Sequence, residues 1–375
     1  MDQQETLYAI ALTRLNYFSL AGLTELYDRL GSATAVMDCR KNIREVLPDA
    51  SDKLVAALAD MSEPLKRAEA ELDFNISKGI KTLVKNDPDY PQRLRECPDA
   101  PLVLFYRGTA DLNRKHIVSI VGTRHATVYG QDIIRRFCME LRELCPDILV
   151  VSGLAYGIDI CAHRNSLDYG FETVAVMAHG QDQLYPPRHA ETAIRMLTHG
   201  GLLTEFTTGT RPDKMNFVKR NRIVAGISDA TILVESAAHG GGLITTSIAR
   251  SYSRDVFAFP GAVGAPYSEG CNNLIRDNGA ALITCAADFV KAMNWTDSHE
   301  LDKSRRKGIE RQLFPELTAE EQIVVHALSH DNDQQINMLT VHCNLPVAKL
   351  NAILFSLEMK GVVRTLAGGI YHLLN

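Results

Sequence analysis

Residues 117–130 read Ile-Val-Ser-Ile-Val-Gly-Thr-Arg-His-Ala-Thr-Val-Tyr-Gly. The β-branched run 117–121 predicts a strand buried on both faces, as in a parallel sheet covered by helices. Gly122 ends this run, and apolar residues recur every three or four positions from 133 to 144, which predicts a helix. Such a junction lies at the carboxyl end of a strand, where backbone N–H groups and Arg124 favour an anion such as phosphate. An ordinary strand–turn–helix with Arg124 in a surface ion pair explains the stretch about equally well.

Strand-like and helix-like runs alternate from residue 117 to residue 295. The strand-like runs cover residues 117–121, 148–152, 173–178, 202–206, 231–235, 256–259 and 281–284. The helix-like runs cover residues 129–144, 158–169, 188–198, 217–227, 243–252, 272–277 and 288–295. This alternation with short connections predicts an α/β fold with a doubly wound, mostly parallel sheet of the Rossmann-like class.

A small helical domain is expected before this sheet. Residues 1–70 read as short helices, which resemble a sterile-alpha-motif or helix-hairpin-helix module. DNA-binding hairpins of the second kind usually carry a Gly-x-Gly turn, but residues 18–20 read Phe-Ser-Leu. We therefore expect packing or protein contact from this domain. Residues 71–300 form the expected central domain, which begins with a connecting arm that contains a short strand at 102–106.

A linker and a third domain are expected after the sheet. Residues 301–315 have few apolar side chains, so a solvated linker explains their basic residues better than contact with a phosphate backbone does. Residues 316–375 read as three helices and two short strands around a Gly-Gly turn, a winged-helix pattern. Winged helices often bind DNA. Here the third helix offers only Lys349 and Lys360, beside Glu358, so protein contact explains this domain at least as well.

Composition restricts the function classes. Forty Lys and Arg residues against 45 Asp and Glu residues give a formal net charge of −5. This balance argues against a globally basic DNA coat, so a nucleic-acid role requires a local patch. The sequence contains no run of about 18 apolar residues, so no membrane span is expected. The N-terminus lacks the basic start and apolar middle of a signal peptide. The eight cysteines include no Cys-x-x-Cys pair, which favours free thiols in a reducing cytoplasm.

Two further glycine loops follow strand-like runs. Ser152 and Gly153 end the second run and precede a helix, which again places exposed amides at the carboxyl edge of the sheet. Residues 240–242 form a triple glycine between a strand and a helix. Glycines permit close backbone approach, and a helix N-terminus favours phosphate. The sequence around this triple glycine is neither a Walker loop nor a Gly-x-Gly-x-x-Gly motif.

The segment 211–222 is the local basic patch. It holds five basic residues and one acidic residue, a net charge of +4, and it includes Phe217. Cations that follow phosphates beside an aromatic ring that stacks on a base suit single-stranded nucleic acid. Phe217 fits helical spacing with Val224, so burial in the core explains it equally well.

No catalytic constellation stands out. Gly-x-Ser-x-Gly, His-Glu-x-x-His and metal-spaced clusters are missing from the sequence. Asp159 and His163 lie four residues apart and can face one another on a helix, but we favour a structural role for both. Glu205 and Glu235 end strands near the expected groove, where they can serve as hydrolytic carboxylates or can orient basic residues.

Taken together, these motifs resemble the DNA-processing protein A family, also called DprA or Smf. The resemblance is dense over about residues 75–285. It is carried by Tyr90-Pro91, Val121-Gly122-Thr123-Arg124, Tyr129-Gly130, residues 152–159 with Ala162-His163, Asp182 with Tyr185-Pro186, Glu205, Phe217 with Arg220-Asn221-Arg222, Glu235, Gly241 with Leu243 and Thr245, Pro260-Gly261, and Gly270 with Asn272. The helical and winged-helix units fit the variable ends of this family.

The resemblance implies an extended Rossmann-like domain that binds single-stranded DNA without a nucleotide cofactor, a metal or catalysis. It further implies a protein that protects incoming single strands during natural transformation, helps to load the RecA recombinase and forms a homodimer. No membrane partner is expected. The expected DNA-binding residues are Gly122, Thr123, Arg124, Ser152, Gly153, Lys214, Phe217, Lys219, Arg220, Asn221, Arg222, Gly240, Gly241, Gly242 and Thr245.

The sequence departs from the family pattern at three places. Residues 240–242 are three glycines where Ser-Gly-Ser is common, Thr123 replaces a common Ser, and His189 replaces a frequent Asn. The lost hydroxyls would leave phosphate contact to the backbone amides. The alternative function is a nucleotide-hydrolysing Rossmann-like enzyme of the lysine-decarboxylase-like phosphoribohydrolase type. Its Pro-Gly-Gly-x-Gly-Thr-x-x-Glu pattern is missing, since Leu-Ile-Thr-Thr follows the triple glycine. A scaffold with a vestigial groove is a third reading.

Overall fold

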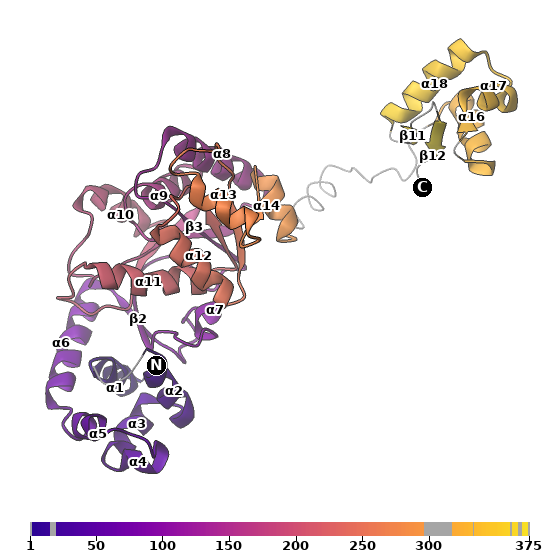
Figure 1. Cartoon of the computed structure of the whole chain (residues 1–375). Coiled ribbons are helices and arrows are strands. Elements are labelled where there is room, and N and C mark those ends of the chain that lie inside the picture. Colours follow the sequence, from indigo (N-terminus) through magenta and orange to yellow (C-terminus); the bar gives the residue numbers. More distant parts are fainter. Residues whose placement is uncertain are drawn as a thin grey trace. The chain divides into compact units, whose positions relative to one another are not determined.

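The computed structural model of the chain describes residues 2–15, 20–295, 317–332, 334–360, 362–366 and 370–373. The chain divides into two compact units, residues 1–296 and residues 297–375 (Figure 1). The expected linker, 301–315, lies outside the described residues, as do residues 18 and 19 of the expected hairpin turn.

The first unit is built on a nine-stranded sheet. Its strands, in spatial order, are β1 (Lys81–Val84), β2 (Val103–Gly108), β6 (Gly200–Thr204), β5 (Glu172–Val176), β4 (Ile148–Ser152), β3 (His116–Val121), β7 (Ala230–Leu233), β8 (Asp255–Ala258) and β9 (Ala281–Leu282). Neighbours from β6 to β9 pair in parallel, whereas β1 and β2 form an antiparallel edge. The predicted α/β fold with a mostly parallel sheet is confirmed.

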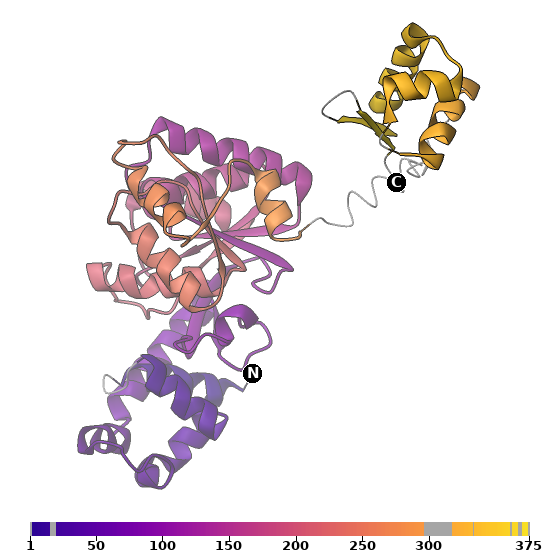
Figure 2. The same ribbon diagram turned by 45° about the vertical axis from the view of Figure 1, so that its right-hand side comes forward.

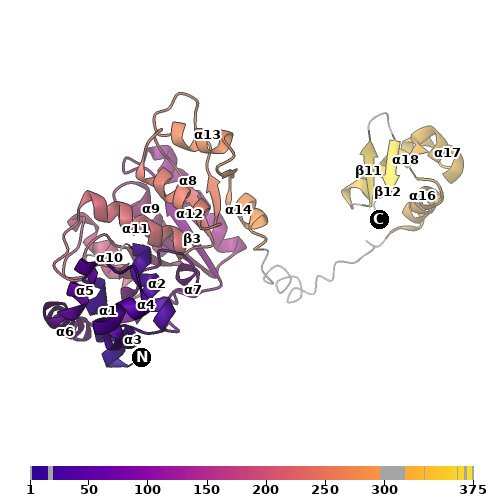
Figure 3. The ribbon, with the colours of Figure 1, turned by 60° about the horizontal axis from the view of Figure 1, so that its bottom comes forward.

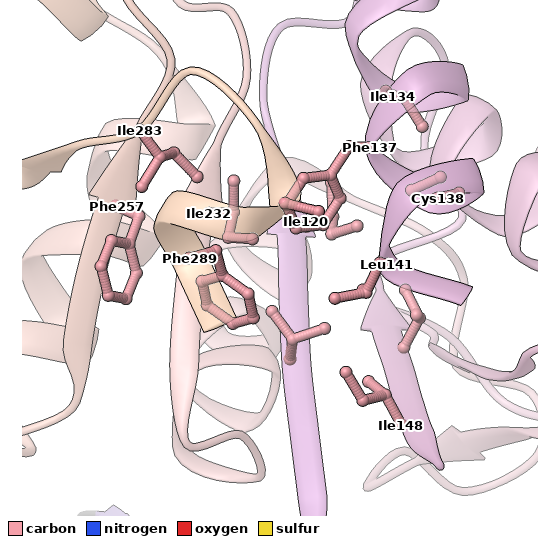
Figure 4. Packing of buried hydrophobic residues seen from close by; sticks show 14 of the residues in the cluster. Ile120, Ile134, Phe137, Cys138, Leu141, Ile148, Ile232, Phe257, Ile283 and Phe289 are labelled. Carbon is pink, nitrogen blue, oxygen red and sulfur yellow. The ribbon is translucent and has the colours of Figure 1, made fainter. Parts of the chain in front are cut away.

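Strand β3 lies inside the sheet and is buried along its whole length. Val118 and Ile120 enter a hydrophobic cluster in which Phe137 and Phe289 also lie (Figure 4). The alternate residues of the strand, Ile117 among them, enter a second cluster on the other face. Full burial of such a side chain is worth about 1.5–3 kcal/mol. A continuous apolar run is therefore most stable in an inner strand, where helices cover both faces of the sheet.

Helices cover both faces of this sheet (Figure 2). The face that carries Ile120 packs against α8 (Val128–Leu144), α9 (Ile158–Asp168) and α14 (Ala286–Ala292). The opposite face packs against α7 (Gln92–Arg95), α11 (Lys214–Gly226), α12 (Gly241–Ser251) and α13 (Glu269–Arg276), and α10 (Ala190–Met196) lies beside β5 and β6. Coverage on both faces confirms the doubly wound arrangement.

The direction of the connections reverses between β3 and β7. From β3 the chain moves through β4 and β5 to β6, and it then crosses to β7 and moves outward to β8 and β9. Ligands of doubly wound sheets bind at the carboxyl ends of the strands where this order reverses. The segments that follow β3 and β7 therefore frame the expected site.

The N-terminal region is helical, as predicted. Its helices are α1 (Gln3–Thr13), α2 (Leu20–Leu30), α3 (Ala33–Cys39), α4 (Ile43–Val46), α5 (Asp52–Ala59) and α6 (Ser62–Lys78). They gather at one end of the first unit (Figure 3) and share a hydrophobic cluster with residues of β2. Helix α6 runs across the expected boundary between residues 70 and 71. The expected connecting arm also contains β1, which was not predicted and which pairs with β2 to extend the sheet.

The second unit has the predicted winged-helix elements. They are α16 (Ala319–His330), β10 (Gln334–Gln335), α17 (Ile336–Cys343), α18 (Val347–Met359), β11 (Val363–Leu366) and β12 (Ile370–Leu373). Strand β12 pairs with both β10 and β11. Among the described residues, no single helix is long and apolar enough to cross a membrane; α17 and α18, bent by 105°, meet that length and composition only when taken together.

Candidate nucleic-acid interface

A cavity of about 780 Å³ lies where the segments after β3, β4 and β7 meet helix α11. We name it the switch-point cavity. Twelve of the fifteen residues predicted to bind DNA line it, namely Gly122, Thr123, Arg124, Gly153, Lys214, Phe217, Arg220, Asn221, Gly240, Gly241, Gly242 and Thr245. The fold thus brings together three loops that are far apart in the sequence.

Glycine is required where the loops after β3 and β7 touch. A Cβ atom on Gly242 would lie 3.2 Å from the Cα atom of Gly122 and 2.7 Å from a methyl group of Leu233. Helix α12 begins at Gly241, and within the described part of the chain no side chain caps its first amides. Uncapped amides at a helix N-terminus attract anions, so this wall suits a phosphate group.

Arg220 is a buried cation at the base of the cavity, with only 3% of its surface exposed. Its Nη1 atom donates hydrogen bonds to the backbone carbonyls of Gly153 and Val176. A Cβ atom on Gly153 would lie 2.2 Å from this nitrogen, which explains the glycine. Burial lowers the pKa of Arg220 to about 10, against the opposing effect of Asp159, so the guanidinium stays charged at neutral pH. Burial raises the pKa of Asp159, and Arg220 opposes that rise.

The ring of Phe217 is half-buried and belongs to none of the hydrophobic clusters formed by the described residues. The guanidinium carbons of Arg124 and Arg220 lie 4.9 Å and 5.9 Å from the ring centroid. The ring of Tyr185 lies 6.0 Å away, centroid to centroid. Cations near an aromatic ring are attracted to its quadrupole. Core burial therefore does not describe this ring, and stacking on a base stays a prediction.

Three predicted residues lie outside the switch-point cavity. Ser152 is fully buried, and its hydroxyl donates a hydrogen bond to the carbonyl of Ile120. Lys219 and Arg222 project from another side of α11 and line a second cavity of about 430 Å³. These placements correct the expectation that all fifteen residues share one groove.

The two candidate hydrolytic carboxylates are engaged elsewhere. Glu205 forms an ion pair with Arg222, so it orients a basic residue. Glu235 accepts hydrogen bonds from the backbone N–H of Thr127, at 2.9 Å, and from its hydroxyl, at 2.6 Å. Thr127 is the N-cap of α8, so Glu235 stabilises the start of that helix.

Asp159 and His163 also have separate structural partners. The hydroxyl of Thr173 donates to the carbonyl of Val150, so His163 Nδ1, which lies 2.7 Å from that hydroxyl, carries the proton and donates to it. Burial lowers the pKa of His163 to about 3, which keeps the ring neutral. Asp159 accepts from the backbone N–H of Ala155. This geometry fits the structural role that we favoured for both residues.

Four residues that sequence reasoning missed also line the cavity: His125, Ser236, His239 and Tyr267. The rings of His125 and Tyr267 are stacked, with centroids 6.0 Å apart. His125 follows Arg124, and His239 precedes the triple glycine, so adjacency to predicted residues was the signal available for both. Tyr267 lies in the loop before α13, where no periodic pattern pointed to it.

The described residues offer little for metal or disulfide chemistry. No group of three or more His, Cys, Asp or Glu side chains among them is arranged to hold a metal ion. All eight cysteines lie in the described part of the chain and form no disulfide there, as predicted, and five of them are buried.

The profile of the family described as DNA recombination-mediator protein A matches residues 81–294. The chain belongs to this family. The profile of the DprA winged helix domain matches residues 310–369, in the second unit. The resemblance drawn from the loop motifs is confirmed.

Related proteins cover most of the chain. The putative DNA processing protein DprA of Mycobacterium tuberculosis is 35% identical over 311 residues, which cover 80% of this chain and 78% of that protein. Protein Smf of Escherichia coli is 31% identical over 320 residues, which cover 84% of this chain and 83% of that protein.

Two solved structures share the fold. DNA processing protein A from Streptococcus pneumoniae matches with a TM-score of 0.65 and 29% identity, over 76% of this chain and 97% of that one. DNA processing protein A from Helicobacter pylori, whose structure was described for its single-stranded DNA binding mode, matches with a TM-score of 0.52 and 26% identity, over 57% and 95%. Family membership thus supports a role in DNA processing.

Proposed function

We propose that this protein binds single-stranded DNA in the switch-point cavity and acts as a recombination mediator. One observation carries the proposal: uncapped amides at the start of α12, the side chain of Arg124 and the half-buried ring of Phe217 line the same cavity. The single-stranded DNA binding described for the Helicobacter pylori relative supports the same choice of ligand.

Each part of the cavity suits one part of a nucleotide. Phosphates suit the amides of Gly241 and Gly242 together with Arg124 and the exposed Lys214. A base suits the ring of Phe217, and stacking on an aromatic ring is worth about 1–3 kcal/mol per base. Because a base inside a duplex is already stacked between its neighbours, the cavity favours a single strand over a duplex.

The family supports a wider role. We infer that the protein protects incoming single strands during natural transformation, helps to load RecA onto them, and acts in the cytoplasm as a homodimer. The proposed function needs no cofactor and no catalytic group. The competing hypothesis, a phosphoribohydrolase-like enzyme, requires a free carboxylate beside the glycine loops, and Glu235 is engaged by Thr127 instead.

Fluorescence anisotropy of a labelled oligothymidine tests the proposal. We expect Phe217→Ala to weaken binding by about 5- to 150-fold, the equivalent of one lost stacking interaction. Met215→Ala is the matched control, because Met215 lies on the same helix, is 63% exposed and does not line the cavity. Unlabelled duplex should compete poorly.

A folded wild-type protein that binds no oligonucleotide would refute the proposal. Incubation with nucleoside monophosphates, followed by chromatography for free base, would then test the enzyme hypothesis directly.

A further inference from the structure

A second cavity lies between the N-terminal helices and the sheet of the first unit. We name this space of about 430 Å³ the junction cavity. Its walls come from the end of α1, from α2, from the segments 100–103 and 205–210, and from α11. Helix α11 borders both cavities. Phe217 lines the switch-point cavity, whereas Lys219, about 200° further around the helix, lines the junction cavity.

The charged side chains of the junction cavity are mostly basic. Arg14, Lys219 and Arg222 line it together with a single carboxylate, that of Glu205. Arg14 and Lys219 are exposed, and Nη1 of Arg14 donates a hydrogen bond to the hydroxyl of Thr207 at 3.1 Å. Three cations against one anion, in a chain whose net charge is −5, form a local site for an anionic group.

Arg222 has hydrogen-bonding capacity that the fold does not use. It is 4% exposed, and its Nη2 atom donates to Glu205. Among the described residues, its Nε and Nη1 atoms have no partner, and neither does Oε1 of Glu205. Leaving a buried charged donor without a partner is costly, so such groups usually meet a ligand or ordered water. Nε and Nη1 lie on different edges of the guanidinium, so each can donate to a separate oxygen of a bound anion such as phosphate.

We propose that the junction cavity is a second phosphate-binding subsite that accepts one nucleotide unit. The phosphate is bound by Arg222 and flanked by Arg14 and Lys219. The base contacts the apolar part of the wall, to which Leu23 and Phe206 belong. A volume of this size suits a small organic ligand.

Two ligands carry the same nucleotide chemistry and could occupy the junction cavity. The nucleotide is either part of a DNA strand that continues over α11 from the switch-point cavity, or a free nucleotide. The first source rests on the proposed function, whereas the second does not.

The test removes the two exposed cations. Arg14→Gln/Lys219→Gln is compared with Lys53→Gln/Lys66→Gln, which removes the same charge from exposed residues of the N-terminal helices that line neither cavity. The exposed pair is chosen because replacing Arg222 would break a buried ion pair and endanger folding. Anisotropy over a salt series uses oligothymidines of about 6 and about 25 nucleotides. Calorimetry with dTMP tests the free nucleotide.

If a DNA strand continues into the junction cavity, we expect Arg14→Gln/Lys219→Gln to bind the long oligothymidine about tenfold more weakly than the wild type does. The salt slope of this binding should be about 1.4 smaller in magnitude. The short oligothymidine should bind to the variant as tightly as to the wild type. For a free nucleotide, we expect dTMP binding that this variant loses and the control keeps. Equal behaviour of the two double variants with every ligand would overturn the proposal. Wild-type protein that binds dTMP through these residues but binds no oligonucleotide would uphold it and refute the proposed function. Wild-type protein that binds neither would refute both.

Discussion

Acidification from pH 7.5 to pH 5.0 is expected to destabilise the first unit through one buried histidine. His163 lies on α9 with no exposed surface. Its Nδ1–H donates to Thr173, and its Nε2 atom has no partner among the described residues. Protonation would therefore place a charged N–H group in the core without an acceptor. This burial lowers the pKa of His163 to about 3 in the folded protein.

The size of the effect follows from linkage. In the unfolded chain the pKa of a histidine is about 6.5, so the unfolded state takes up the proton first as the pH falls. His163 therefore lowers the free energy of unfolding from about pH 6.5 downward, and its effect ends near pH 3, where the folded state is also protonated. At pH 5 the folded ring is still neutral. The loss is then set by the 1.5 units between pH 5 and the unfolded pKa, and it amounts to about 2 kcal/mol.

Urea unfolding measures this loss. The single tryptophan of the chain, Trp295, lies in the hydrophobic cluster under α8 and α9, so its fluorescence reports on the first unit. Between pH 7.5 and pH 5.0 we expect the wild type to lose about 2 kcal/mol more than His163→Gln does. His199→Gln replaces an exposed histidine and should keep the full response of the wild type. Equal losses in the wild type and His163→Gln would refute the reasoning.

Further predictions concern the glycine loops and the cation beside them. Arg124→Ala should reduce the salt slope of oligothymidine binding by about 0.7, as expected for one lost phosphate contact, and an unchanged slope would exclude that contact. Gly130→Ala would place a Cβ atom 2.1 Å from Oε2 of Glu235 and displace this carboxylate from the start of α8, so we expect about 2–4 kcal/mol of destabilisation in urea unfolding. Gly241→Ala, whose Cβ atom would meet nothing within 4 Å, should leave stability within about 0.5 kcal/mol. Gly242→Ala should weaken anisotropy-measured binding more than Gly241→Ala, because it forces the loops after β3 and β7 apart; equal binding would show that their contact is dispensable.

The inner parallel strands, from β6 to β7 in the order of the sheet, could be predicted because they are buried on both faces. Their apolar runs, such as 148–152, are bounded by glycine or polar turns, and the observed strands start and end within about two residues of the predicted ones. Strand β1, of sequence Lys-Thr-Leu-Val, is a short edge strand that mixes exposed and buried residues. It lacks that continuous signal. The predicted domain boundary after residue 70 falls inside α6, where no Gly or Pro marks an end; the helix continues to Lys78 and is capped by Gly79.

The basic residues of segment 211–222 line two different cavities, and the helical phase of the sequence already indicates this division. Helix α11 begins at Lys214, because the side chain of Asp213 caps it by accepting from the N–H of Asn216. The prediction placed this start at Phe217 and treated the preceding cations as a loop. Helical phase at 100° per residue puts Lys214 within about 60° of Phe217 and Lys219 about 200° away. Helical phase within the predicted helix thus already separates Lys219 from Phe217, and recognition of the cap would have added Lys214 to the side of Phe217. The two N–H donors of Arg222 that lack a partner among the described residues, by contrast, result from tertiary packing, which no local sequence pattern predicts.

Arg220 shows why a basic residue in a binding loop need not contact the ligand. Its guanidinium holds the carbonyls of Gly153 and Val176, and its Nε atom donates to Asn221 at 3.2 Å. These bonds fix the loop after β4 against α11, so they determine the shape of the cavity. The charge itself acts through a poorly hydrated region, where Coulomb interactions are screened less than at the surface. A lysine would keep the charge but not the planar set of donors, so the two roles of Arg220 are separable in principle. The loop geometry requires the guanidinium, whereas attraction of a phosphate requires only a cation, and Arg124 already supplies one at the opening beside Phe217.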